Sequence, residues 1–481
     1  MTVIFGKVRL EGVQFALCLL VGVLSGGILL LGAPLKWEIA LLAGLGTTVF
    51  MLVVGNPKRI LLFVLAFTVP IYFGKAFIIG QERFSLTGGA GINLPDVLAL
   101  MLLLLFLAKL ARRQTEIRFF PWITIPALMW LILSSFSLVA AKDGQLAIIQ
   151  LINMAKLLLL CWIVANSIGD EADVTFVITG IMLGMLFQAL VGVYQGVTGR
   201  PVGLEFLTET AEVHKQVLSG GSVNRVQGTL GHPNSYAMYL TTVIPFALAW
   251  LFFTTRLSLK VLAGISLCLG GLALMYSLSR SAWINFLVII SIVLVLAVRR
   301  KRISSWAAVL IAGTTSLILL GLVFFGPEII LSRLTSNDQG SAYSRITLAQ
   351  TALAIIKDHP WVGVGLNNYN LVSPQYDVTA YVRQYVVHNV YLLIAAETGP
   401  VGLMAFLGFL AILLIQAWRI ISRAPDDTVW VAGVGLFSAF VAVASHSMTD
   451  YALLGSLPVS TQFWLLAGLS AALIQRIDHE E

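Results

Sequence analysis

Long apolar runs separated by short polar connections recur along almost the whole chain. Runs of roughly 20 residues with few charges match the helix length that crosses a bilayer core of about 30 Å. About fourteen such runs can be placed, near residues 13–31, 38–54, 60–73, 95–110, 121–141, 147–166, 172–196, 234–253, 258–278, 282–298, 306–326, 400–418, 429–444 and 458–472. The pattern predicts an all-α polytopic membrane protein, with residues 1–481 forming a single integral membrane domain.

Basic residues mark alternate ends of these runs and therefore predict their orientation. The connections on one side carry Lys7, Arg9, Lys58, Arg59, Lys109, Arg112, Arg113, Arg118, Arg256, Lys260, the cluster 299–302, Arg419, Arg423 and Arg476. By the positive-inside rule this side is cytoplasmic. We therefore expect both termini inside and two long loops, residues 197–233 and 327–387, on the outer face of the membrane.

Composition supports this class of protein. Hydrophobic residues make up 58% of the chain, charged residues only 11%, and the mean hydropathy is +0.92, so a soluble globular protein is excluded. The net charge of +7 mostly reflects the topology and favours attraction to anionic membrane lipids, so it needs no nucleic-acid partner. The three cysteines, Cys18, Cys161 and Cys268, lie in apolar runs without C-x-x-C spacing, so neither structural disulfides nor thiolate metal sites are expected.

Two arginines stand out among the polar residues expected on the outer face. Arg225 and Asn234 bracket the sequence that ends the first long loop, and Arg280 lies between two serines in a short outer turn. As a pair, two guanidiniums offer bidentate recognition of a diphosphate. Each also has a simpler explanation, since Arg280 could reach lipid phosphates and Arg225 could be a solvated loop charge.

The segment from His388 to Gly402 carries the clearest candidate for catalysis. A histidine at the mouth of a membrane helix can accept a proton near neutral pH, which suits a general base acting on a membrane-held substrate. A continuous helix over residues 388–418 would be roughly 46 Å long and would overshoot the bilayer, so a break is expected at Gly399 and Pro400, with Thr398 as a cap. Glu397 would point away from His388 and is a poor candidate to orient it.

The second long loop should contain an amphipathic helix over residues 344–358, lying on the outer surface. Gly363 and Gly365 after it resemble a phosphate-binding loop only faintly, and a tight turn is the better interpretation.

The remaining histidines carry less weight as catalytic candidates. His232 suits a helix cap as well as catalysis, and His214, His359 and His446 are expected to be ordinary polar residues of outer loops. Neither an H-E-x-x-H sequence nor an acidic pair suggests a metal site, so the chemistry is expected to need no metal or other cofactor.

These motifs together resemble the O-antigen ligase and polymerase family of bacterial envelope enzymes. The resemblance covers residues 225–402. It rests on Arg225 before Gly-His-Pro-Asn, on the Ser-Arg-Ser turn at Arg280, on Arg345 followed by the Asp-x-Pro-x-x-Gly-x-Gly loop, and on His388-Asn389 nine residues before Gly-x-x-Gly. It implies a glycosyltransferase-C-like membrane fold and a glycan donor on a polyprenyl (undecaprenyl) pyrophosphate carrier, used at the periplasmic face.

In that family context each candidate residue has an expected role. Arg225 and Arg280 would bind the pyrophosphate and stabilise the charge that grows on it. His388 would take the proton from the attacking sugar hydroxyl, with inversion at the anomeric carbon. Supporting roles are expected for Arg345, Asn389, Tyr391 and Asn234.

Three functional classes stay open on sequence grounds. A glycan polymerase or ligase is favoured over an anion transporter, for example of inorganic carbon, because transporters usually place polar residues near the midplane. A purely structural scaffold would not need His388 beside two arginines. A polymerase is preferred to a ligase that attaches O-antigen to lipid A core, because of the many spans and the long second loop. The acceptor would be a carrier-linked glycan, with a chain-length regulator as a further partner.

Overall fold

The computed structural model describes residues 56–71, 73–78, 89–202, 214–218, 221–301, part of 303–313, 341–376 and 385–480. Within these residues ten helices are long and apolar enough to cross a membrane. They are α4 (Leu94–Ala111), α5 (Pro121–Ser135) continued by the 3-10 helix η1 (Phe136–Ala140), α6 (Gly144–Ser167), α7 (Glu171–Thr198), α8 (Pro233–Phe253), α9 (Leu257–Tyr276), α10 (Arg280–Arg299), α15 (Val390–Arg423), α16 (Asp427–His446) and α18 (Leu457–Glu480). The chain is therefore a multi-pass, predominantly helical membrane protein.

Ten of the fourteen predicted spans are confirmed by these helices. The spans near 13–31 and 38–54, and most of 306–326, lie outside the described residues. The expected span at 60–73 is wrong, because α3 (Pro57–Thr68) has only 12 residues, or about 18 Å of helix. Pro70, directly after the C-cap residue Val69, explains the early end, since a proline has no amide hydrogen to continue the helical hydrogen bonds.

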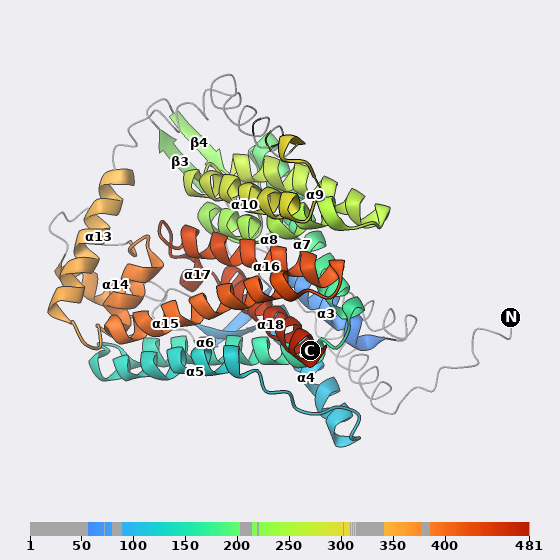
Figure 1. Ribbon diagram of the computed structural model, residues 1–481. Helices are drawn as coiled ribbons and strands as arrows, with labels where there is room; N and C mark the ends of the chain where they lie inside the picture. The colour runs from blue at the N-terminus through green and yellow to red at the C-terminus, as the bar shows by residue number, and fades with distance from the viewer. Residues whose placement is uncertain are drawn as a thin grey trace, which may run out of the picture.

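The helices run side by side as a bundle whose long direction crosses Figure 1 horizontally. Helices α9 and α10 form one edge, α5 and α6 form the opposite edge, and α15 and α16 lie between them (Figure 1). Helices α8 and α18 are the most enclosed, with 89% and 94% of their apolar windows buried. Two antiparallel hairpins, β1 (Gly74–Ile78) with β2 (Ala90–Asn93) and β3 (His214–Leu218) with β4 (Gly221–Arg225), add a little sheet.

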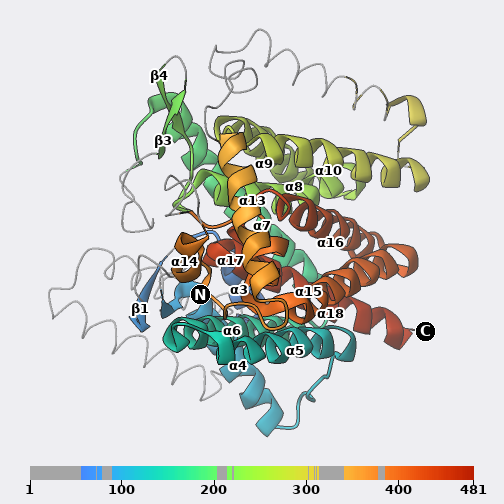
Figure 2. The same ribbon diagram turned by 90° about the vertical axis from the view of Figure 1, so that its left-hand side faces the viewer.

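One end of the bundle is covered by the second long loop. The predicted amphipathic helix is confirmed as α13 (Ser341–Asp358), which crosses this end nearly at right angles to the bundle (Figures 1 and 2). Its apolar face, with Leu348, Ala352 and Ile355, packs against Leu393 and Ala396 of α15. The short helices α14 (Tyr369–Val372), η3 (Ser373–Gln375) and α17 (Ala452–Gly455) lie at the same end.

The predicted break in the helix after His388 is confirmed. Within α15, Gly399 adopts φ 72° and ψ −177°, a backbone conformation that is essentially restricted to glycine, and Pro400 follows it. The expected cap at Thr398 is wrong, because the Thr398 hydroxyl donates to the Ile394 carbonyl at 2.8 Å instead. The kink thus depends on the glycine and the proline, while Thr398 bonds back to the preceding turn.

The turn at Gly363 and Gly365 is held against this kink. The amide of Val364 donates to the Ala396 carbonyl, and the amide of Gly365 donates to the Glu397 carbonyl, both at 2.9 Å. Both glycines have positive φ, which confirms the tight turn predicted from sequence. The buried Glu397 side chain accepts from the Tyr369 amide at 3.3 Å, so it holds this turn and does not orient His388.

We expect Gly399→Ala to lower the stability of the protein by about 2 kcal/mol, because alanine is strained at this φ and ψ. Its Cβ would also come within 2.2 Å of the Trp361 carbonyl oxygen. The matched control is Gly408→Ala, nine residues further along α15, where an added Cβ meets nothing within 4 Å. Thermal unfolding of both purified variants in detergent checks this, and equal unfolding temperatures would contradict it.

Candidate functional site

Four segments that are distant in sequence meet at the end of the bundle covered by α13. Arg225 ends β4, Asn234 lies in the first turn of α8, His388 precedes α15 and Asp450 follows α16. The Arg225 guanidinium donates from Nη2 to Asn234 Oδ1 at 2.8 Å, and Asn234 Nδ2 donates to Asp450 Oδ2 at 2.7 Å. His388 Nδ1 lies 3.4 Å from the same Asp450 oxygen. The structure thus joins three of the predicted site residues through a fourth residue, Asp450, that sequence reasoning missed.

Asp450 is buried, with 3% of its surface exposed, and both oxygens of its carboxylate have hydrogen-bond partners. Besides Asn234 and His388, it accepts a hydrogen bond at Oδ1 from the Ala452 amide at 2.8 Å, which fixes the turn into α17. Burial alone would raise the pKa of the Asp450 carboxyl, but the His388 hydrogen bond and the imidazoles of His388, His232 and His446 hold that pKa well below its usual range. The carboxylate therefore stays ionised at physiological pH.

A signal for Asp450 was present in the sequence. It is an acidic residue directly after an apolar span, at the end where His388 was also expected. Its pairing with a histidine 62 residues away could not be seen locally.

His388 has the geometry of an oriented general base. Its side chain is 21% exposed, so it is accessible from one side while the other side faces Asp450. The ring also packs against Tyr451, with the ring centroids 5.3 Å apart. With Nδ1 directed at a carboxylate, Nε2 is the nitrogen that can accept a proton from a substrate.

Asn389 and Tyr391 fix the position of His388 by tying α15 to α16. The Asn389 side chain caps α15 by accepting from the Leu392 amide at 3.0 Å, and its Nδ2 donates to the Met448 carbonyl at 3.0 Å. The Tyr391 hydroxyl donates to the Ala444 carbonyl at 2.7 Å. Both residues contact the protein backbone, so the contacts observed here position His388.

The two candidate arginines lie at neighbouring points of the structure. Arg225 is buried, and its Nε donates at 2.9 Å to the carbonyl of Ser277, which begins the turn that leads to Arg280. Arg280 is half-buried and is the first residue of α10. The free amides of a helix N-terminus attract anions, so Arg280 adds its charge where the backbone already favours a negative ligand.

The structure corrects the expectation for His446 and confirms the cap role expected of His232. His446 is not a polar loop residue but the fully buried last residue of α16, with Nε2 3.4 Å from the Ser281 hydroxyl. It is buried because α10, which carries Ser281, packs on α16. His232 is the N-cap of α8 and accepts at Nδ1 from the Asn234 amide at 3.2 Å.

Arg345 is exposed on α13, outside the hydrogen-bonded chain of Arg225, Asn234, Asp450 and His388. It lies close enough to His446 to act on its ring electrostatically. His359, further along the loop, lies 3.4 Å from the Tyr376 hydroxyl and is exposed.

A family model matches part of the chain. Residues 263–407 match the family model described as O-antigen ligase, a range that contains Arg280, Arg345 and His388. A search of curated proteins found no match to the chain. Arg225, Asn234 and Asp450 fall outside the matched range but are hydrogen-bonded to one another and to His388 within it. The chain therefore carries a domain of the O-antigen ligase family, whose members are membrane glycosyltransferases of the O-antigen ligase and polymerase type.

Proposed function

We propose that the protein transfers a glycan from a polyprenyl pyrophosphate carrier to an acceptor sugar hydroxyl at the periplasmic face of a bacterial inner membrane. The observation that carries this proposal is the pairing of the accessible His388 ring with the buried Asp450 carboxylate, linked through Asn234 to Arg225. A base oriented by a carboxylate next to cationic groups is what a transfer with an anionic leaving group requires.

The proposed reaction is a single displacement. His388 Nε2 accepts the proton of the acceptor hydroxyl while the oxygen attacks the anomeric carbon of the donor sugar. The bond from that carbon to the pyrophosphate oxygen breaks on the opposite face, and the carrier pyrophosphate leaves with the bonding electrons, which inverts the configuration. Asp450 stabilises the imidazolium that forms and keeps the ring in the productive orientation.

The proposed anion site has two arginines with different roles. Arg280 contacts the pyrophosphate from the N-terminus of α10, where the helix amides add to its charge. Arg225 contributes positive charge from its buried position and holds the turn before Arg280 through the Ser277 carbonyl. Neutralisation of the leaving group by these cations lets the transfer proceed without a divalent metal.

A transporter is the weaker alternative. Transporters usually place polar residues near the midplane of the membrane, and Lys156, in the middle of α6, already has a partner within the protein. This lysine of α6 forms an ion pair with Asp96 at 2.9 Å and donates to the Gly91 carbonyl at 3.2 Å. Lys156 therefore has a structural role as an anchor between α6 and α4. The candidate residues Arg225, Arg280 and His388 lie instead at the end of the bundle.

Within this class of enzyme, we propose that the protein is a polymerase of O-antigen or exopolysaccharide. Helix α13 packs beside the first turns of α15 and leaves Ile346 and Leu353 exposed. An amphipathic helix with apolar residues still exposed suits an acceptor held in the membrane, as both a carrier-linked glycan and lipid A core are. The preference for a polymerase therefore rests on the many spans and the long second loop.

The first prediction for this site concerns the base. We expect His388→Ala to abolish transfer and Asp450→Asn to lower kcat by about 10²- to 10⁴-fold with little change in KM, because the amide cannot stabilise an imidazolium. Product formation from purified carrier-linked glycan measures both. The matched control is His359→Ala, which changes an exposed histidine of the second long loop and should retain activity. Near-normal turnover by His388→Ala would remove this residue from the mechanism.

The arginines are tested by replacement with lysine, which keeps the charge but loses the two-pronged donor geometry. We expect Arg280→Lys to lower kcat/KM about 10- to 100-fold without changing the unfolding temperature, and Arg225→Lys to lower both, since two buried hydrogen bonds depend on its guanidinium. Arg256→Lys, an exposed arginine at the opposite end of the bundle, is the control. If both site variants behave like the wild type, these arginines do not bind the donor.

Deletion of the chromosomal gene separates polymerase from ligase. In a polymerase mutant, envelope glycans should consist of single repeat units on the carrier or on lipid. A gel of envelope glycans measures their length and attachment. Long chains stranded on the carrier, with none attached to lipid A core, would instead identify a ligase and contradict the proposal.

A further inference from the structure

A cavity of about 500 Å³ lies at the end of the bundle opposite His388, where α4 ends and the connection to α5 begins. It combines an apolar wall with several polar and charged side chains. Its lining includes Lys58, Phe106, Lys109, Gln114, Glu116 and Arg118. The cavity belongs to the basic end of the protein, far from the proposed glycan site.

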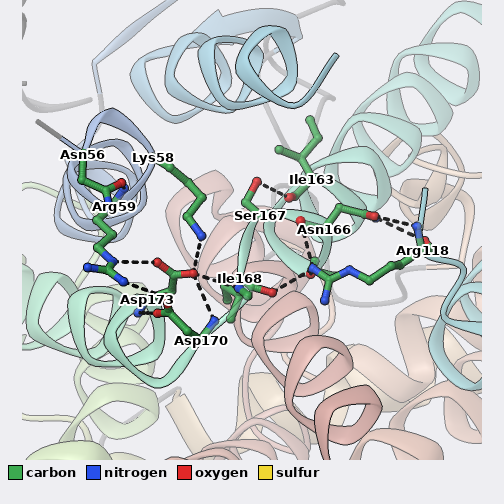
Figure 3. Close-up of polar contacts among 12 residues, drawn as sticks. Asn56, Lys58, Arg59, Arg118, Ile163, Asn166, Ser167, Ile168, Asp170 and Asp173 are labelled. Carbon is green, nitrogen blue, oxygen red and sulfur yellow. Dashed lines mark hydrogen bonds and ion pairs between the residues drawn. The ribbon is translucent and has the colours of Figure 1, made fainter. Parts of the chain in front are cut away.

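The polar wall of this cavity is held rigidly by Arg118. Its amide donates to Asn166 Oδ1 at 3.0 Å, and its Nη2 donates to the carbonyls of Ala165, Asn166 and Ile168 at 2.8 to 3.0 Å (Figure 3). One guanidinium nitrogen thus binds the end of α6 and the start of the connection to α7. The protein's own hydrogen bonds therefore fix this wall.

The same connection is fixed from its other side by a second cluster of charges. Lys58 forms an ion pair with Asp173, and Arg59 pairs with Asp173 at 3.1 Å and with Asp170 at 2.6 Å (Figure 3). Two cations face two carboxylates here, so this cluster is neutral in itself. The charge of Lys58 is therefore already balanced. Any net positive charge of the cavity has to come from its other basic residues.

That excess comes from Lys109 and Arg118. Among the residues that the structure describes, the Lys109 ammonium has no hydrogen-bond or ion-pair partner, and the Nε and Nη1 donors of Arg118 have no hydrogen-bond partner either. Glu116 supplies one opposing charge. Burial lowers the pKa of the Arg118 guanidinium below the ordinary arginine value, and an anion bound beside it would offset part of this desolvation.

The surroundings of the cavity are those of a membrane interface. On α4, Leu104 and Leu107 are 46% and 45% exposed beside the apolar wall, and they have the outward position of lipid-facing residues. In the connection and the first turn of α5, Phe119 and Trp122 are also exposed. Exposed aromatic rings at the end of membrane helices are typical of the level of lipid headgroups.

We propose that this cavity binds the phosphate headgroup of an anionic glycerophospholipid of the inner leaflet. The phosphate lies between Lys109 and Arg118, and the acyl chains follow the exposed leucines of α4. Basic pockets between membrane helices on the cytoplasmic side are known to suit such headgroups. The site would join α4, α5 and the connection between α6 and α7 through one bound lipid.

Binding of phosphatidylglycerol to the full-length protein in detergent, followed by native mass spectrometry, tests this proposal. We expect Lys109→Gln to weaken binding about fivefold, since one basic side chain near a membrane surface is worth about 1 kcal/mol. Gln114→Trp, which fills the cavity at an exposed position without changing the charge, should weaken binding at least as much. The matched control is Lys260→Gln, which removes the same charge at the same end of the bundle but does not line the cavity.

Several outcomes would overturn the proposal. Equal loss of binding in Lys260→Gln and Lys109→Gln, or full binding by Gln114→Trp, would show general attraction of lipid to basic residues instead of a site. Tighter binding of undecaprenyl phosphate than of phosphatidylglycerol, lost in the same two cavity variants, would assign the cavity to the carrier lipid. Because Lys109 is exposed and its side chain forms no hydrogen bond or ion pair with the residues that the structure describes, its variant should fold normally, which the unfolding temperature verifies.

Discussion

The buried carboxylate of Asp450 is the constraint around which the candidate site is built. An ionised carboxylate removed from water is strongly unfavourable unless it is paired and hydrogen-bonded. Asp450 meets this requirement with the Asn234 amide, the Ala452 backbone amide and the His388 ring. Each partner comes from a different element, so satisfying one charge fixes the relative positions of α8, α15 and α17.

The same carboxylate connects the proposed base to the proposed anion site. Asn234 accepts from Arg225 with its oxygen and donates to Asp450 with its nitrogen, so its amide orientation is determined by both neighbours. Asn234 thereby bridges the positive charge of Arg225 and the negative charge of Asp450. Loss of either charge would leave the other buried without its compensation, which explains why this network needs all its members.

Rigidity at this end of the bundle comes from backbone geometry as much as from side chains. The kink at Gly399 exposes the carbonyls of Ala396 and Glu397, and the amides of the 363–365 turn satisfy them. This turn in turn places Asn368, whose side chain accepts from the Asp143 amide at 2.7 Å and so connects the second long loop to the start of α6. The opposite end of the bundle is held instead by ion pairs such as Arg59 with Asp170.

The sequence by itself determined the membrane class, ten of the described helices, the kink at Gly399, α13 and the candidate residues Arg225, Arg280 and His388. These features depend on local properties, namely the length of apolar runs, backbone preferences and residue type. Only the tertiary structure decided that Asp450 orients His388, that His446 is buried against Ser281 and that α3 is too short to span the membrane. The physical reason is that a polar residue at the end of an apolar run has the same local pattern whether it faces solvent or a partner. Its partner can be 62 or 216 residues away, and helix packing alone selects it.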